Sequence, residues 1–262
     1  MRYFLELAYD GTNYHGWQTQ PNARTVQEVL DKCLSTILRQ PVETVGSGRT
    51  DTGVHAAQQY SHFDLNQELS INNFCHRLNR LLPPDISALN IYPVGPEAHA
   101  RFNAVSRTYE YRIVQAKDPF QQRFTHYLSQ PVNLDLMNEA AALLLEFEDF
   151  TSFSKVKGDT LHYRCQMHVA YWQPQATGLL FTIKSNRFLR GMVRLVVGTL
   201  LDVGKGKILP QDFKRILAAQ DRRQASGAAP AAGLFLTQVQ YPDNYFQEQQ
   251  EIFTQNKTSA GL

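Results

Sequence analysis

The sequence predicts an α+β fold of two similar halves, with mostly antiparallel mixed sheets flanked by helices and an active-site cleft between the halves. Segments with strand and helix periodicity alternate irregularly along the 262 residues, and hairpins occur among the strands. This order favours antiparallel pairing over a doubly wound parallel sheet. The series of elements restarts near residues 98–107, so we expect an N-terminal half at residues 1–103 and a C-terminal half at residues 104–262.

The N-terminal half begins with a strand at residues 2–9, where alternate side chains share a face. Asp10-Gly11 then marks a turn. A helix is expected at residues 25–38, because Thr25 is a suitable N-cap and Glu28 completes a capping-box pattern. Further along, the sequence predicts a Gly-rich loop at 46–53, a strand at 58–63, a helix at 71–82 closed by Pro83-Pro84, and a strand at 87–94.

The C-terminal half opens with strict alternation at residues 108–114, where Tyr109, Tyr111 and Ile113 share the face opposite Glu110 and Arg112. The polar tail from residue 243 is expected to fray. Between these segments we expect a helix at 134–147, a hairpin of strands 168–173 and 179–185, helices at 186–203 and 210–219, and a strand at 233–241.

Composition sets limits on function. Hydrophobic residues make up 43% and charged residues 19%, as in ordinary soluble globular proteins, and the net charge is only +2. A nucleic-acid partner would therefore require locally concentrated positive charge. Three scattered cysteines indicate neither a disulfide framework nor a zinc ribbon and favour the reducing cytoplasm. Glu6 argues against a signal peptide, and no apolar run reaches the length of a membrane span.

The segment GSGRTDTGVHA, residues 46–56, is the most informative part of the N-terminal half. It places Arg49, Asp51 and His55 among three glycines, and glycines allow another molecule to approach the backbone closely. Taken alone, an aspartate in such a loop is more often a turn or cap residue than a reactive one. A P-loop is excluded because no Gly-Lys-Ser/Thr follows the glycines.

Two features of the C-terminal half also suggest a site. Arg187, Arg190 and Arg194 are spaced three and four apart on the expected helix, so they would lie along one face. Arg194 stands among apolar residues and needs an anionic partner, either a carboxylate or a ligand phosphate. Tyrosines spaced like Tyr109 and Tyr111 usually belong to the core, but an aromatic ring beside a carboxylate and arginines also suits stacking on a nucleobase.

Other chemistries receive less support. His162, Cys165 and His168 have no fourth ligand at suitable spacing, so zinc is not expected. A glycoside hydrolase with two carboxylates would need a second acid near Asp51. Asp10 is the candidate, although a turn explains it more simply.

Together these segments resemble the tRNA pseudouridine synthases of the TruA type. The match runs through five ordered blocks that cover nearly the whole chain. Thr52 and Gly191 depart from the residues usual in that family. The blocks are AYDGTNYHGWQTQ with TVQEVL, GSGRTDTGVHA, SRTYEYRI, NRFLRGMVRLVVGTLLDVG and APAAGLFLTQVQY.

The resemblance implies an isomerase that converts uridine to pseudouridine at tRNA positions 38, 39 and 40, as a homodimer and without a cofactor or metal. Asp51 would be the catalytic carboxylate, with Arg194 keeping it ionised, Tyr109 against the uracil and Leu234 in the pocket wall. Arg49 and His55 would contact the RNA. Phosphate contacts would come from Arg187, Arg190, Lys205, Lys207, Arg222 and Arg223.

Two rival functions are a tRNA-binding module without catalysis and a carboxylate-dependent glycoside hydrolase. The first predicts binding without any change to uridine, and the second predicts free base or sugar and a second essential acid.

Overall fold

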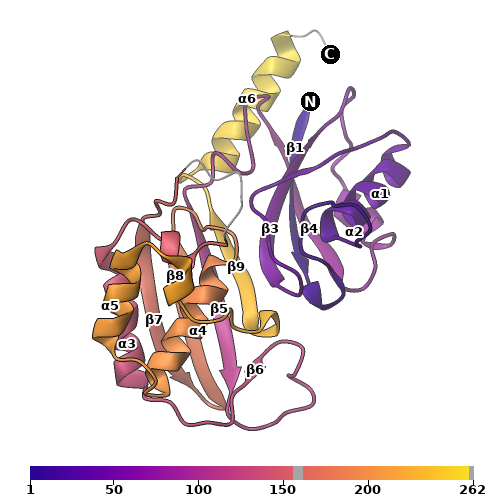
Figure 1. The fold of residues 1–262 in the computed structure, drawn as a ribbon. Helices are drawn as coiled ribbons and strands as arrows, with labels where there is room; N and C mark the ends of the chain where they lie inside the picture. The colour runs from indigo at the N-terminus through magenta and orange to yellow at the C-terminus, as the bar shows by residue number, and fades with distance from the viewer. Residues whose placement is uncertain (156–161, 260–262) are drawn as a thin grey trace. The chain divides into compact units, whose positions relative to one another are not determined.

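The computed structural model describes residues 1–155 and 162–259 (Figure 1). The chain forms two compact units, and we describe each by itself. The first contains residues 1–105 and 238–262, and the second contains residues 106–237. The second unit is thus inserted into the sequence of the first.

The first unit is built on an antiparallel sheet. Strand β1 (Arg2–Tyr9) pairs with β3 (His55–Asp64) on one side and with β4 (Ile86–Val94) on the other. The short strand β2 (Val45–Gly46) adds to β3. Helices α1 (Val26–Leu38) and α2 (Phe74–Asn79) pack with this sheet, and the backbone N–H of Glu28 donates to Thr25 Oγ1, as the capping pattern predicts.

The C-terminal tail forms a helix, α6 (Tyr245–Ser259), where the sequence suggested fraying. Its overall composition is polar, but its first turn carries two aromatic residues. Phe246 stacks on Tyr92 with ring centroids 4.3 Å apart, and Tyr245 packs near Phe4 at 6.1 Å. These rings fix the helix on the first unit. The expected division had placed this tail in the C-terminal half, whereas the structure groups it with the N-terminal residues.

The second unit contains antiparallel strands in the order β5 (Ser106–Val114), β8 (Gly178–Ser185) and β7 (Met167–Gln175). A two-residue strand, β6 (His126–Tyr127), runs parallel to β5. Helices α3 (Leu134–Ala142), α4 (Met192–Gly204) and α5 (Pro210–Ala219) pack together on this sheet (Figure 1).

The last strand, β9 (Leu234–Gln240), crosses from one unit to the other: its first four residues belong to the second unit and its last three to the first. The predicted fold class is confirmed, since both units consist of mostly antiparallel strands with helices packed on them. In the described part of the chain, no helix combines the length and apolarity that a bilayer crossing requires.

The helix expected at 186–203 is shorter than its hydrophobic pattern suggested. Residues 186–191 are not helical, and α4 begins at Met192 behind Gly191, whose φ of 72° is left-handed. The backbone N–H of Asn186 donates to the Gln166 carbonyl and the N–H of Gln166 donates to Asn186 Oδ1, which holds this segment beside the end of β8. Arg187 and Arg190 therefore precede the helix, and the prediction that they share a helical face with Arg194 is wrong.

Candidate active site

The Gly-rich loop at residues 46–56 is anchored to β3 by a small hydrogen-bond network. The N–H of Ser47 donates to the Tyr60 carbonyl at 2.7 Å, and its hydroxyl donates to Gln59 Oε1 at 2.8 Å. Gln59 Nε2 returns a bond to the Gly48 carbonyl at 2.9 Å. Ser47 and Gln59 are both buried, so the strand side of the loop is fixed.

The other side of the loop rests on the segment that follows β1. The Trp17 N–H donates to the Thr50 carbonyl, and the Gly53 N–H donates to the Tyr14 carbonyl at 3.1 Å. Gly16 has a φ of 87°, and a Cβ there would lie 2.3 Å from the Thr50 carbonyl oxygen. Two blocks of the sequence resemblance, 35 residues apart at Gly16 and Asp51, therefore form one packed structure.

Asp51 occupies the turn at the end of this packed region. Its carbonyl accepts from the Val54 N–H at 3.1 Å, and the turn continues through Gly53, whose φ of 76° is left-handed. Asp51 is half-buried, while Arg49 is exposed two residues earlier. The backbone of Asp51 is therefore held from both sides.

His55 lies behind this turn and is only 1% exposed. Its Nδ1 is 3.1 Å from the Gly11 nitrogen and 3.1 Å from Asp10 Oδ1. Donation by the Gly11 N–H requires Nδ1 to be an acceptor, and we favour this neutral tautomer because Asp10 Oδ1 already accepts from the N–H and hydroxyl of Thr12. Asp10 thus caps the turn after β1, as its simpler interpretation predicted, and His55 ties that turn to the loop.

In the second unit, the segment 225–233 lies against α4. The Ala229 N–H donates to the Arg194 carbonyl at 2.8 Å, and Arg194 Nε donates back to the Ala229 carbonyl at 2.7 Å. A Cβ on Gly198 would lie 1.9 Å from the Gly227 carbonyl oxygen, so only glycine allows the approach. The half-buried Arg194 side chain is consequently oriented by the backbone beside it.

The same segment leads into β9 across the end of β5. Tyr111 is fully buried, and its hydroxyl donates to the Pro230 carbonyl at 2.9 Å. Burial raises the pKa of Tyr111 well above its ordinary value, and the nearby Arg194 charge opposes this shift. Leu234 follows as a buried residue at the start of β9. Arg194, Tyr111 and Leu234 are therefore linked through residues 229–234.

Tyr109 lies two residues before Tyr111 on β5 and pairs in register with Ile183 of β8. Its ring meets Phe188 edge to face, with centroids 5.2 Å apart, and the residue is 9% exposed. The candidate residues thus form two groups: Arg49, Asp51 and His55 belong to the first unit, and Tyr109, Arg194 and Leu234 belong to the second.

Several of the expected phosphate-binding cations have protein partners. Lys207 pairs with Asp202 at 2.9 Å, and Arg223 pairs with Asp221 at 2.7 Å. The Arg222 guanidinium donates to the Ala225 carbonyl, and Arg187 lies 3.0 Å from His162 Nε2. Exposed ion pairs of this kind exchange readily with solvent and ligands.

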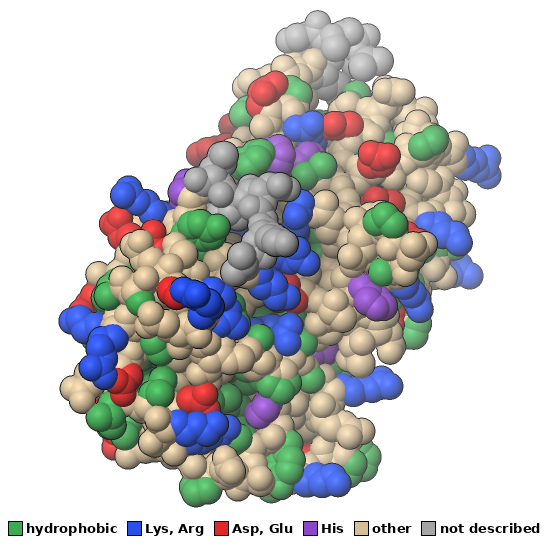
Figure 2. All heavy atoms as spheres, viewed as in Figure 1, with side chains coloured by type: hydrophobic (Ala, Val, Ile, Leu, Met, Phe, Trp, Pro, Cys, Tyr) green, Lys and Arg blue, Asp and Glu red, His purple; other side chains and the backbone are tan. Residues whose placement is uncertain are grey.

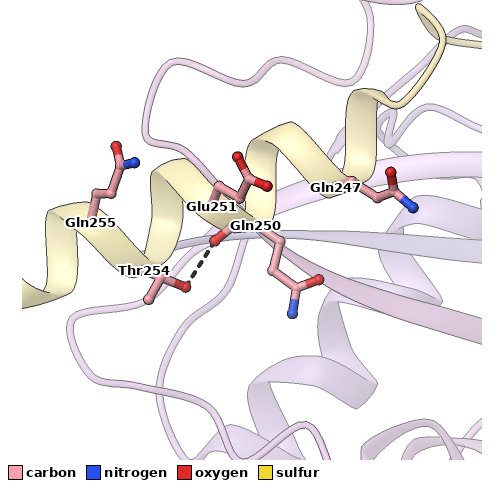
Figure 3. Close-up of a pocket in the computed structure, with 5 residues that line it drawn as sticks. All are labelled: Gln247, Gln250, Glu251, Thr254 and Gln255. Carbon is pink, nitrogen blue, oxygen red and sulfur yellow. Dashed lines mark hydrogen bonds between the residues drawn. The ribbon is translucent and has the colours of Figure 1, made fainter.

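Two hollows of the first unit lie along α6 and contain none of the candidate residues. Figure 3 shows one of them, of about 520 Å³, lined by amide side chains, Glu251 and Thr254, whose hydroxyl donates to the Gln250 carbonyl. Gly95 and Ile252 are among the residues that line the other. Within residues 1–155 and 162–259, no cluster of three or more His, Cys, Asp or Glu side chains is arranged to hold a metal ion.

Sequence reasoning missed the residues that support the loop, chiefly Gly16 and Trp17. Both residues lie in the first sequence block of the family resemblance, AYDGTNYHGWQTQ. Their packing against residues 46–51 could not be seen, because it joins segments distant in sequence.

Comparison with known proteins identifies the family to which the chain is similar. A family model described as tRNA pseudouridine synthase matches residues 7–103 and 140–242. The chain is 49% identical over 251 residues to the tRNA pseudouridine synthase A of Bacteroides thetaiotaomicron, covering 95% of this chain and 93% of that protein. It is 48% identical to the protein of the same name from Bacteroides fragilis, over 94% of this chain and 98% of that one. The corresponding protein of Chlorobium luteolum is 40% identical, over 92% and 96% of the two chains.

Proposed function

The chain belongs to the tRNA pseudouridine synthase family of isomerases, and from that premise we propose that it converts uridines 38, 39 and 40 of the tRNA anticodon stem-loop to pseudouridine. The observation that carries the proposal is the match to a tRNA pseudouridine synthase A over 95% of the chain at 49% identity. We further propose that it acts in the cytoplasm as a homodimer and without a cofactor.

In the proposed reaction Asp51 is the catalytic carboxylate, acting on the ribose or the base of a nucleotide turned out of the RNA. The N1–C1′ glycosidic bond breaks, the uracil rotates, and a C5–C1′ bond forms. N1 gains a proton and C5 loses one, so the product is an isomer of the substrate. The anchoring of Asp51 on both sides supports this role, because a fixed carboxylate needs little reorganisation when the base arrives.

The other candidates have binding roles in this proposal. Turning a base out of the stack costs a few kcal/mol, and stacking on Tyr109 would offset part of that cost. Arg194 would keep Asp51 ionised, and its Nε bond to the Ala229 carbonyl supports this by limiting the orientations of the guanidinium. Leu234 would form part of the pocket wall. Arg49 is exposed and suited to contact phosphate.

His55 fits a positioning role better than the RNA contact suggested by the resemblance. The side chain is buried and lies against Asp10 and Gly11. We propose that it holds the Asp51 loop against the turn after β1.

The decisive test is Asp51→Asn, which keeps the size of the side chain and removes its charge. With tRNA carrying 5-tritiated uridine, the wild type should release tritium and the variant should release none above background. tRNA affinity should change by less than about threefold, because one half-buried carboxylate contributes little to phosphate-dominated binding.

Tritium release by Asp51→Asn at a tenth of the wild-type rate or faster would remove Asp51 from the mechanism. A wild type that binds tRNA but leaves its uridines unchanged would support the binding-only alternative. Hydrolysis would instead be favoured by two results together: the wild type releases free uracil, and the Asp10→Asn variant is folded but inactive. Mass-spectrometric mapping of tRNA from cells with and without the gene tests the three positions.

A further inference from the structure

The segment between β5 and β6, residues 115–125, is a loop whose ends lie side by side. β6 pairs with the last residues of β5, Ile113 with His126 and Val114 with Tyr127. The Leu128 N–H closes the base of the loop on the Val114 carbonyl at 2.9 Å. Compact loops of this length with adjacent ends are frequently functional. Figure 1 shows it as a broad excursion beside β6.

Internal hydrogen bonds give the loop a defined shape. Asp118 Oδ1 accepts from the Phe120 N–H at 2.8 Å, and its Oδ2 accepts from Gln121 Nε2 at 2.7 Å. The Gln121 carbonyl accepts from the Phe124 N–H and from the Thr125 hydroxyl, both at 2.9 Å. The loop is therefore folded on itself.

Phe120 is 92% exposed at the tip of this structured loop. An aromatic side chain presented to water in this way gains nothing from the fold of its own unit. Lys117 and Arg123, each three residues away, are also exposed. Blue and green side chains lie over this part of the surface in Figure 2, marking the basic and apolar character of the loop.

The base of the loop is joined to the start of β9. The Phe124 ring lies 6.3 Å from the ring of Phe235, the residue after Leu234, and the Arg112 guanidinium lies over the Phe235 ring, 4.0 Å from its centroid. A Cβ on Gly233 would lie 3.2 Å from the His126 nitrogen. The loop thus projects from the backbone that carries Leu234.

We propose that this loop is a second RNA contact, in which Phe120 stacks on an unpaired base outside the reacting nucleotide and Lys117 and Arg123 bind neighbouring phosphates. The inference rests on the proposed function, since it requires an RNA substrate. A planar ring between two cations suits single-stranded RNA, which is bound by stacking and by phosphate contacts. Lysine is depleted in the cores of protein interfaces, so this composition favours RNA over a second protein.

Filter binding and steady-state kinetics with an unmodified 5-tritiated tRNA transcript test the inference. Phe120→Ala should raise the Kd and the KM about 5- to 150-fold, as expected for loss of one stacked base, with kcat within about twofold of wild type. Phe120→Trp should bind like the wild type, and Phe120→Leu should bind like Phe120→Ala. Tyr171→Ala is the matched control, since Tyr171 is an exposed aromatic residue (43%) of the same unit on β7.

The cations have a separate readout. Replacing Lys117 and Arg123 together by Gln should reduce the slope of log affinity against log salt by about 1.4 to 1.8, the value for two lost phosphate contacts. An unchanged slope would overturn the phosphate contacts.

Equal affinities for Phe120→Ala and Tyr171→Ala would overturn the stacking, as would normal affinity of Phe120→Leu. A change of molecular mass in light scattering with Phe120→Ala would also overturn it and assign the loop to a contact between copies of the chain. Pseudouridine formation by the wild type is measured in the same preparation. Its absence would refute the proposed function, while the Kd series would still decide whether the loop binds RNA.

Discussion

Substitution of Gly16 by Ala would test whether the support beneath the Asp51 loop determines activity. Gly16 has a φ of 87°, and its added Cβ would lie 2.3 Å from the Thr50 carbonyl oxygen and 3.1 Å from the Asp51 carbonyl carbon. Ordinary contact begins near 3.4 Å, so the loop must move by roughly 1 Å. The left-handed backbone costs about 1–2 kcal/mol for alanine and the steric conflict about 1–3 kcal/mol.

Gly16→Ala should therefore destabilise the protein by about 2–5 kcal/mol and lower its Tm by about 4–20 °C. Displacement of Asp51 by about 1 Å should reduce kcat for pseudouridine formation about 100-fold, well beyond the effect on tRNA affinity. Thermal unfolding and tritium release at a temperature where the variant remains folded measure the two effects independently.

Two other glycines distinguish the backbone strain of Gly16→Ala from the steric conflict of its added Cβ. Gly206 has a φ of 71° but no atom within 4 Å of an added Cβ, so Gly206→Ala reports backbone strain alone. Gly48 lies in the same loop as Asp51 and also has open space around an added Cβ, with a φ outside the left-handed range. Gly48→Ala should leave Tm unchanged, and Gly206→Ala should lower it by a few degrees. If Gly16→Ala matches Gly206→Ala in Tm and the wild type in kcat, the packed loop does not position Asp51.

Three further predictions concern titration and the arginine of α4. Burial raises the pKa of Asp31 to about 6 despite hydrogen bonds from the Thr44 N–H and hydroxyl, so its ionised form opposes folding above that pH. Asp31→Asn should gain about 1–2 kcal/mol of stability relative to wild type between pH 4 and pH 7, after allowance for partial exposure, and equal pH profiles in urea unfolding would contradict this. Burial lowers the pKa of His62 to about 4, with the Arg2 charge acting in the same direction, so wild-type stability should fall as the pH drops from 6.5 to 4. His62→Asn retains an acceptor for the Ala100 N–H and should flatten that part of the curve; an unchanged slope would assign the loss to other groups. Arg194→Lys keeps the charge but loses the Nε bond to the Ala229 carbonyl, and kcat should fall at least tenfold with little change in tRNA affinity, whereas full activity would show that charge alone suffices.

Local patterns in the sequence predicted most of the fold. Alternation identified β5, and the face shared by Tyr109, Tyr111 and Ile113 is buried as expected. The N-cap at Thr25 was visible because its partner lies three residues away. The start of α4 was mispredicted because helical periodicity continues through residues 186–191, while the contact between Asn186 and Gln166 that holds this segment joins distant parts of the chain.

The candidate site was predictable only in part. From the residues alone, a structural turn was the better explanation of Asp51, and the family resemblance favoured chemistry. The burial of His55 was hidden because it depends on Asp10 and Gly11, more than forty residues earlier in the chain. The exposed residue Phe120 was overlooked, since a single aromatic residue in a loop has no periodicity to interpret.

The placement of α6 has a consequence for the order in which the protein folds during synthesis. The first 105 residues emerge from the ribosome without the helix whose Phe246 covers Tyr60 and Tyr92. That surface, which also carries the buried carboxylate of Glu6, stays uncovered until the entire inserted unit has been synthesised. The first unit is therefore begun before the inserted unit and completed after it, and a chain truncated before residue 245 has a first unit with an uncovered aromatic surface.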